Sequence, residues 1–545
     1  MDNQTRIRFL CDEYSYLDNL KATLASEFQE IVDYVLPDRS NITRWETPGA
    51  RRGRVRYDDT AVDSVEILAG NLAATIVPMG AQWMSIVAQQ TELRRRKRIA
   101  DWSQEVSELM IGAMATSNFY QAMDECFLDL VGFGTAAPYG ELKRGKLNYI
   151  TWPIRDYVFS CDTDGRPSRI YRKWKMTPKQ MDERFRKHPG FKQLGQTAQA
   201  ALDAWETVDA GTRNREIEVL HVIGPREHYQ PGKAGARNMP IESCYVNVTD
   251  MVIIAEGGYE EMPVNIVRWR MTSDDAGWGR GCGQKAMSNI LSLNVCRKLM
   301  HKAGAKDLDP PLLIDDRGVI GNVRTMSNGI TYLRPGARME YLTSGQRIDL
   351  AQFGLERITN EVKQAFYADH LRLPPPQGTP MTATEMQMRW ELMERLLGPT
   401  LGRIVTELMN PIVERTFGLL MRDGQLPEPP QELIDAELDI EYLGPLARAQ
   451  QMPEVASIER TWQFATNLAQ LTGDRAALRR LDADESVKRV AQLYGFPADA
   501  LRDDDEVAAM AEQEQQEAQG MQDRQDAMMA ADMASKVPQQ QGRAA

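Results

Sequence analysis

The sequence of 545 residues is poor in the features that usually mark a metal site or a secreted protein. Its six cysteines are scattered, with no Cys-x-x-Cys pair among them, which argues against both a disulfide framework and a zinc site. Its five histidines are not clustered either, and this weakens a metal site further. We therefore expect no metal and no cofactor, and a chain that folds in a reducing cytosol.

The chain also lacks an excess of positive charge. Lys and Arg number 65 against 77 Asp and Glu, which gives a formal net charge of −12. A protein that binds nucleic acid regardless of sequence neutralises phosphates with an excess of Lys and Arg. The charge balance argues against such a binder, but it is compatible with a protein past which nucleic acid slides without sticking.

Long hydrophobic runs are scarce as well. The first residues, MDNQTRIRFLCDEY, are charged and contain no apolar core, so no secretory signal is expected. Residues 67–91 carry no charge, but Asn71, Pro78 and Gly80 would be costly or disruptive in lipid. An amphipathic helix, a Pro-Met-Gly turn and a short strand explain this stretch better, and no membrane partner is expected.

The apolar pattern predicts an α+β protein that is predominantly helical. After Thr60, apolar residues recur every three or four positions, as on one face of a helix: Val62, Val65, Leu68, Leu72 and Ile76. Residues 131–275 differ, because β-type runs such as SCDTDGRPSRIYRKWKM, with a turn at Asp164-Gly165, predict strands. Within them, Thr177-Pro178-Lys179-Gln180 predicts the start of a helix.

Residues 277–306, GWGRGCGQKAMSNILSLNVCRKLMHKAGAK, open with glycines and continue as a helix. One stripe of this helix is apolar: Met287, Leu291, Val295 and Leu299. DPPLLIDD and NGITYLRPG predict short strands, and a helix follows from about 350 to 370.

A stiff, uncharged segment, LPPPQGTP, then separates that helix from another. The next helix begins at the capping box Thr382–Glu385 and continues to about residue 422. Pro399 and Pro411 lie inside it, and each should remove a backbone hydrogen bond and bend the helix. The chain after residue 503 is polar, acidic and rich in Gln, Ala and Met, so we expect it to be largely disordered.

Two clusters of positive charge interrupt the N-terminal part, at residues 51–56 and 94–98. Each is either a solvated face or a contact with DNA or with an acidic neighbouring subunit. A phosphate-binding loop is the main enzymatic alternative, because Gly279-Arg280-Gly281-Cys282-Gly283 precedes a helix. This segment lacks the Gly-Lys-Ser/Thr ending, and no catalytic serine or zinc motif occurs. The chain does not read as an enzyme.

Five stretches, in this order, resemble the portal proteins of short-tailed bacteriophages, which form the head-to-tail connector family. They are NLAATIVPMGAQWMSI, DLVGFGTAAPYGE, EGGYEEMPVNIVRWRMTSDDAGWGRGCGQKAMSNILSLN, KDLDPPLLI, and the long run from AFYADHLRLPPPQGTPMTATEMQMRWE to NPIVERTF. Together they span roughly residues 15–450. The resemblance implies a non-enzymatic portal fold assembled as a ring of twelve subunits, each with a wing, a stem, a clip and a crown.

The resemblance also implies a division of the chain. The segments are 1–170, N-terminal wing; 171–275, clip with a possible first stem helix; 276–308, stem helix; 309–370, wing; 371–383, tunnel loop; 384–425, long kinked wing helix; 426–502, crown; and 503–545, low-complexity tail. The tunnel loop would project towards DNA and touch it weakly, since its residues offer almost no charge: Arg372, Pro374, Pro375, Pro376, Gln377, Gly378 and Thr379.

Four basic residues of the stem helix are candidates for lining the channel: Lys285, Arg297, Lys298 and Lys302. Replacing Lys298 and Lys302 with glutamate is expected to impair DNA packaging or retention while rings still assemble. The implied partners are other copies of the chain, double-stranded DNA, the terminase large subunit, the major capsid protein and a tail adaptor. The implied location is the capsid vertex of a virion assembled in the host cytoplasm. The alternatives are a nucleotide-dependent DNA-processing enzyme and a scaffold or minor capsid protein without a pore.

Overall fold

The computed structural model describes most of the chain and divides it into two units. The described residues are 2–44, 49, 56–94, 96–207, 209–230, 235, 238–273, 276–314, 318–323, 330–341, 348–371, 397–433, 436–443, 445–472, 478–494 and isolated positions between 507 and 528. The first unit is Met1–Trp83 with Leu109–Leu426, and the second is Met84–Glu108 with Pro427–Ala545.

A five-stranded antiparallel sheet, in the order β5-β6-β7-β8-β9, forms one layer of the first unit. Its strands are β5 (Tyr157–Cys161), β6 (Pro167–Met176), β7 (Ile217–Pro225), β8 (Ile241–Asn247) and β9 (Val252–Tyr259). The β5–β6 hairpin turns where the sequence predicts, because the Asp162 carboxylate accepts the N–H groups of Asp164 and Arg166. These hydrogen bonds stabilise the turn, so the role of Asp162 is that of a turn residue.

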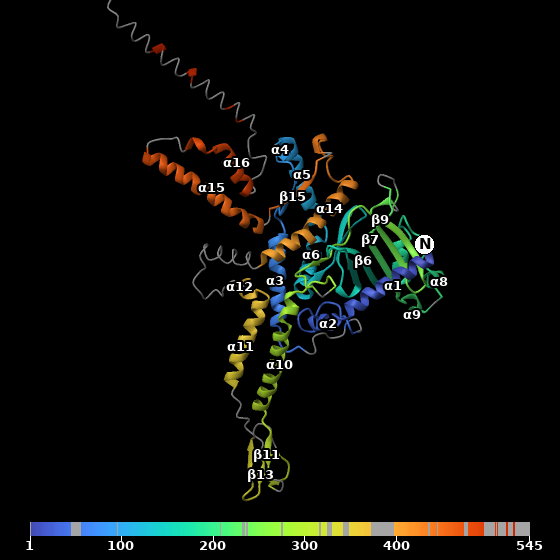
Figure 1. Ribbon diagram of the computed structural model, residues 1–545. Helices are drawn as coiled ribbons and strands as arrows, with labels where there is room; N and C mark the ends of the chain where they lie inside the picture. The colour runs from blue at the N-terminus through green and yellow to red at the C-terminus, as the bar shows by residue number, and fades with distance from the viewer. Residues whose placement is uncertain are drawn as a thin grey trace, which may run out of the picture. The chain divides into compact units, whose positions relative to one another are not determined.

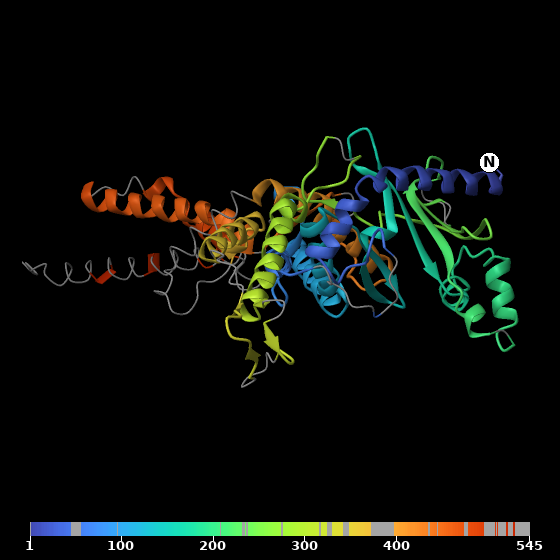
Figure 2. The ribbon, with the colours of Figure 1, turned by 90° about the horizontal axis from the view of Figure 1, so that it is seen from below.

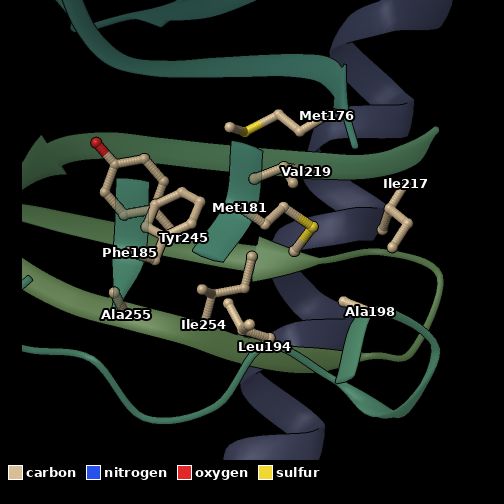
Figure 3. Close-up of a cluster of buried hydrophobic side chains, with 10 residues drawn as sticks. All are labelled: Met176, Met181, Phe185, Leu194, Ala198, Ile217, Val219, Tyr245, Ile254 and Ala255. Atoms are coloured by element: carbon tan, nitrogen blue, oxygen red, sulfur yellow. The ribbon is translucent and has the colours of Figure 1, made fainter. Parts of the chain in front are cut away.

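Helices cover both faces of the sheet. One face packs against α7 (Pro178–Phe185) and α8 (Gln196–Asp203), through Met181, Phe185 and Ala198, as Figure 3 shows. The other face packs against Ile7 and Leu10 of α1 (Asn3–Ala22), which lies along the sheet in Figures 1 and 2. Short α9 (Ala210–Arg213) follows α8.

The predicted boundary at 170/171 falls inside β6. Helix α1 shares a core with the sheet, so residues on both sides of this boundary pack together. The predicted capping box at Thr177 and Gln180 is confirmed. The helix it starts has eight residues and packs against the sheet through Met181 and Phe185.

A helical core adjoins the sheet. It contains α2 (Ala25–Tyr34), α3 (Thr60–Ile76), α6 (Phe119–Phe133), the hairpin β3 (Pro138–Lys143) and β4 (Lys146–Thr151), and the short pair β2 (Thr135–Ala136) and β10 (Val267–Arg268). On α3, Val65, Leu68 and Leu72 are buried as the pattern predicts. Val62 and Ile76 are only half-buried, so the buried face is rotated slightly from the predicted one.

An arm extends from this core and consists of two helices joined by short hairpins. Helix α10 (Cys282–Leu308) packs along α11 (Ile348–Ala365), and α12 (Ala368–Leu371) follows. At the far end of the pair, β11 (Leu312–Ile314) pairs with β14 (Met339–Tyr341), and β12 (Val319–Ile320) pairs with β13 (Tyr332–Leu333) (Figure 1). The predicted short strands are therefore present. We call α10, α11 and these strands the arm.

A bent helix completes the first unit. Residues 397–404 are α-helical, Val405–Met409 form a π-turn, and α14 (Asn410–Arg422) continues the helix. The π-turn ends two residues before Pro411, one of the two prolines that the sequence predicts to disturb this helix. The region around Pro399 begins at the edge of the described residues, and the predicted capping box at Thr382–Glu385 lies outside them.

The second unit joins two parts of the chain that are far apart in sequence. Strand β1 (Met84–Ala88) pairs antiparallel with β15 (Leu438–Tyr442), and the unit also holds α4 (Thr91–Arg94), the start of α5 (Lys97–Ala115), α15 (Pro445–Thr472) and α16 (Ala483–Tyr494). The Trp102 indole donates to the Pro427 carbonyl at 3.2 Å. Residues 84–108, predicted to belong to the N-terminal wing, therefore belong with the segment predicted as the crown.

The uncharged stretch at residues 67–91 has the predicted form. Helix α3 ends at Ile76, a turn contains Gly80 with φ +80°, and β1 follows. Across the described part of the chain, no helix is both long and apolar enough to cross a membrane.

Candidate functional site

The glycine-rich segment before α10 is shaped by close backbone packing. A Cβ atom added to Gly279 would lie 2.2 Å from the Gly134 carbonyl oxygen, and one added to Gly281 would lie 2.5 Å from the Val131 carbonyl oxygen. No side chain fits there, because real Cβ atoms never approach so closely. Glycine is therefore needed where the start of α10 touches the end of α6.

The same segment does not offer its N–H groups to a phosphate. Gly279 donates to the Thr135 hydroxyl at 2.9 Å, Arg280 donates to the Arg270 carbonyl at 2.8 Å, and Gly281 donates to the Gln284 side chain at 2.8 Å. A phosphate-binding loop must direct such groups at the ligand. The geometry explains the glycines by packing and weakens the enzymatic alternative.

Buried groups around this segment have structural partners. Trp278 lies against Phe28 and Phe159, with ring centroids 5.9 and 4.7 Å apart. Beneath it, the Lys21 ammonium donates to the backbone carbonyls of residues 154, 155 and 157, and burial lowers its pKa to about 8. Burial raises the pKa of the Cys282 thiol to about 12, so this cysteine is not an activated nucleophile.

The four basic candidates on α10 differ in their surroundings. Arg297 pairs with Asp58, with Nε 2.9 Å from the carboxylate, and the Lys298 ammonium lies 5.4 Å from the Tyr57 ring centroid. These two residues hold the segment before α3 against the helix. Lys285 and Lys302 are exposed and have no charged partner in the described part of the chain. The structure therefore leaves Lys285 and Lys302 available to a ligand more clearly than the other two.

The predicted tunnel-loop residues, Arg372, Pro374, Pro375, Pro376, Gln377, Gly378 and Thr379, lie outside the described residues. The first cluster of positive charge, 51–56, is described only at Arg56, which pairs with Asp59 at 2.6 Å. In the second cluster, Arg94 lies 3.7 Å from Asp439 and Arg96 lies 3.7 Å from Glu432. These arginines have acidic partners within their own chain, so they favour the reading of a solvated, self-paired face.

Two functional candidates were missed by the sequence reasoning. Arg268 is buried at the end of β10, and its guanidinium forms a pair with Glu407 in the π-turn, with Nη2 2.6 Å from Oε1. The pair is separated by 139 residues, so no local pattern indicates it. The one available signal was Pro411, whose ring interferes with the carbonyl four residues before it, that of Glu407.

The arm exposes apolar side chains along its length. Val295 and Leu299 of α10 are 53% and 58% exposed, although they continue the stripe that begins with buried Met287. The hairpin strands expose Leu313, Ile320, Tyr332 and Tyr341. Exposed apolar side chains grouped on one part of a chain are typical of a contact with another protein. Within the described residues, no group of three or more His, Cys, Asp or Glu side chains is placed to hold a metal.

Comparisons with known proteins agree with the resemblance noted in the sequence. The chain is 26% identical over 552 aligned residues to a protein of Bordetella phage BPP-1 named "Probable portal protein", covering 98% of this chain and 96% of that one. It is 24% identical to the portal protein of Salmonella phage epsilon15, covering 95% and 93%.

Among solved structures, a chain of the native gene transfer agent virion is 12% identical and covers 86% of this chain and 99% of its own, at a TM-score of 0.38. That score is too low to support an argument about the fold. The family described as "Bacteriophage head to tail connecting protein" matches residues 10–501, nearly the whole chain. The chain therefore belongs to the bacteriophage head-to-tail connecting protein family, the portal proteins.

Proposed function

We propose that twelve copies of this chain close into a ring at one capsid vertex and form the channel through which double-stranded DNA enters and leaves the head. The observation that carries the proposal is the family match over residues 10–501. The N–H groups of Gly279, Arg280 and Gly281 are bound within the fold, which supports a structural role for the glycine-rich segment.

The exposed apolar stripe of the arm supports ring closure. Val295 and Leu299 would each lose contact with water if a neighbouring copy packed against α10, and burial of apolar surface is the main driving force of such association. A ring interface joins two different faces of the same chain, so the opposite side of the arm would supply the complementary surface.

The hairpins at the end of the arm are better placed than residues 171–275 to serve as the clip. The sheet within residues 157–259 is covered by helices on both faces, so its apolar side chains are already buried within one chain. The short strands between α10 and α11 form only two-stranded pairs in the described residues, and they expose Ile320, Tyr332 and Tyr341. We therefore assign α10 and α11 to the stem, the hairpins to the clip and the sheet to the wing.

Under this assignment, each partner would bind a different part of the chain. The clip would dock the terminase large subunit during packaging and the tail adaptor afterwards, and the wing would contact the major capsid protein. The predicted tunnel loop, residues 397–404 that follow it in the chain, and exposed Lys285 and Lys302 on α10 would approach DNA. A chain of net charge −12 would repel phosphate overall, so these lysines would guide DNA locally without trapping it.

Negative-stain microscopy of the purified protein tests the proposal directly. We expect rings with a central hole; compact monomers or solid particles would support the scaffold or minor capsid alternative instead. An ATPase assay on the same sample separates the enzymatic alternative. Hydrolysis above background that disappears on mutation of the glycine-rich segment would overturn a purely structural role.

A further inference from the structure

The π-turn at Val405–Met409 requires a local explanation. Pro411 has no N–H to donate, and in a regular α-helix its ring would collide with the Glu407 carbonyl. Widening the turn by one residue removes the collision. A π-turn is less favourable than an α-turn and persists where neighbouring contacts hold it.

Glu407 supplies such a contact. Its carboxylate accepts the Arg268 backbone N–H at 3.0 Å, the Nε at 3.3 Å and the Nη2 at 2.6 Å. The Arg268 side chain is 3% exposed and the Glu407 side chain 18%. Charge-assisted bonds of this two-pronged geometry are stronger than neutral ones, and shielding from water strengthens them further.

The same guanidinium reaches the segment that leads into α10. Its Nη1 donates to the Gly277 carbonyl at 3.4 Å and to the Gly165 carbonyl at 2.8 Å, in the β5–β6 turn. Two residues further along from Arg268, the Arg270 carbonyl accepts the Arg280 N–H at 2.8 Å. One arginine thus contacts both the π-turn and the entry to α10.

The helix on the other side of the π-turn is anchored separately. Glu261 accepts a bond from Arg415 at 2.8 Å and from Arg422 at 2.7 Å, and the arginine charges hold the pKa of Glu261 below its ordinary value in spite of burial. Because α14 is fixed in this way, any change in the π-turn must be taken up by the residues before it.

We propose that Arg268 is a positioning residue that couples the helix at residues 397–404 to the start of α10. Loss of the Glu407 contact removes the bonds that hold the π-turn against β10, so the turn and the helix before it open more readily. The Gly277 contact loosens with it. The inference rests on the proposed function in one respect: the two coupled segments are those that would line the same channel.

Hydrogen exchange on the full-length protein tests the coupling. In Glu407→Gln, we expect roughly tenfold faster exchange both in peptides covering 399–411 and in peptides covering 277–287. Glu414→Gln, an exposed change on the same helix, should match the unchanged protein in both. Faster exchange confined to 399–411, or no change in either, would overturn the coupling.

A second variant separates charge from geometry. Arg268→Lys keeps the positive charge. A lysine ammonium cannot form the bidentate hydrogen bonds to the Glu407 carboxylate while also binding the Gly277 carbonyl. We expect it to reproduce the exchange pattern of Glu407→Gln, with normal ring counts and fewer DNA-filled heads. If filled heads are normal while both peptides exchange faster, the pair is structural only. If the unchanged protein forms no rings, the proposed function fails, while the exchange result still decides the coupling.

Discussion

The five-stranded sheet and the arm differ in how far their apolar side chains are exposed to solvent. Strands β6 to β9 contribute buried residues to cores on both faces, β5 contributes Val158 to one of them, and the central strand β7 is buried at most positions. On α10, the buried stripe stops at Asn294, and Val295 and Leu299 beyond it are exposed. The sheet completes its own core within one chain, whereas the arm leaves part of its apolar stripe exposed.

This difference separates stability from assembly. Changes in the sheet should alter the free energy of unfolding of the isolated subunit, because the buried contacts are intramolecular. Changes on the exposed part of the arm should leave that free energy almost unaltered and act on the association of copies. The predictions that follow test this separation in order of their expected effect on unfolding.

The largest effect is expected for Phe185→Ala. Phe185 is 1% exposed and lies 4.9 Å from the Tyr245 ring, so its removal leaves a cavity between α7 and the sheet. We expect a loss of about 3–5 kcal/mol in the free energy of unfolding, measured by chemical denaturation. Phe9→Ala, at a position 44% exposed on α1, is the control and should cost far less. Equal losses in the two variants would contradict the assignment of the sheet core.

An intermediate effect depends on pH. His221 is 2% exposed, stacks on Tyr245 and shares a hydrogen bond with the Ser243 hydroxyl. Burial, followed by the charges of Arg184 and Arg172, lowers the pKa of His221 well below its ordinary value, so it stays neutral in the folded protein. The unfolded chain binds a proton near pH 6.5, so this stability is present above that pH and is lost as the pH falls.

Between pH 7 and pH 5 the loss from His221 is limited to about 2 kcal/mol by the unfolded pKa near 6.5. The measurement is the free energy of unfolding of the unchanged protein and of His221→Gln at both pH values. The variant should lose less stability on acidification, since carboxylate titration is common to both proteins. An identical pH dependence would show that His221 does not supply the acid sensitivity.

Very little effect on unfolding, but a large one on assembly, is expected for Leu299→Glu. A charge at this exposed position stays solvated in the monomer, so the free energy of unfolding should change by under about 0.5 kcal/mol. Burying that charge against a neighbouring copy is costly, so few rings should appear in negative stain. His301→Glu is the matched control, because two residues further along α10 the side chain points about 200° away. If Leu299→Glu forms normal rings, the contact between subunits does not involve this position of α10.

The parts of the fold that the sequence predicted correctly are those with local causes. The turn at Asp164-Gly165 and the capping box at Thr177 depend on residues within four positions of each other, and the structure confirms both. The pairing of β1 with β15 joins residues about 350 positions apart, as Met84 opposite Tyr442 shows, and local pattern cannot reveal such a contact.

The candidate site was predictable to a smaller degree. Sequence identified α10 and its basic residues, but it could not distinguish Arg297, which is paired with Asp58, from Lys302, which has no charged partner among the described residues. The apolar stripe from Met287 to Leu299 is uniform in sequence and half exposed in the structure. A stripe of apolar residues has the same appearance whether its partner lies in the same chain or in the next copy.

The smallest effect on the subunit, and the most specific one on DNA, is expected for Lys302→Glu. Replacing Lys298 as well would also disturb its contact with Tyr57, so Lys302 alone is the cleaner change. Unfolding and ring counts should be unaltered, while the yield of DNA-filled heads falls, and added salt should narrow the difference because exposed charges are screened beyond about 8 Å at physiological ionic strength. Lys187→Glu, at an exposed position after α7, makes the same change in net charge. If both variants lower the yield equally, net charge is responsible; if only Lys302→Glu does, this face of α10 lies towards DNA.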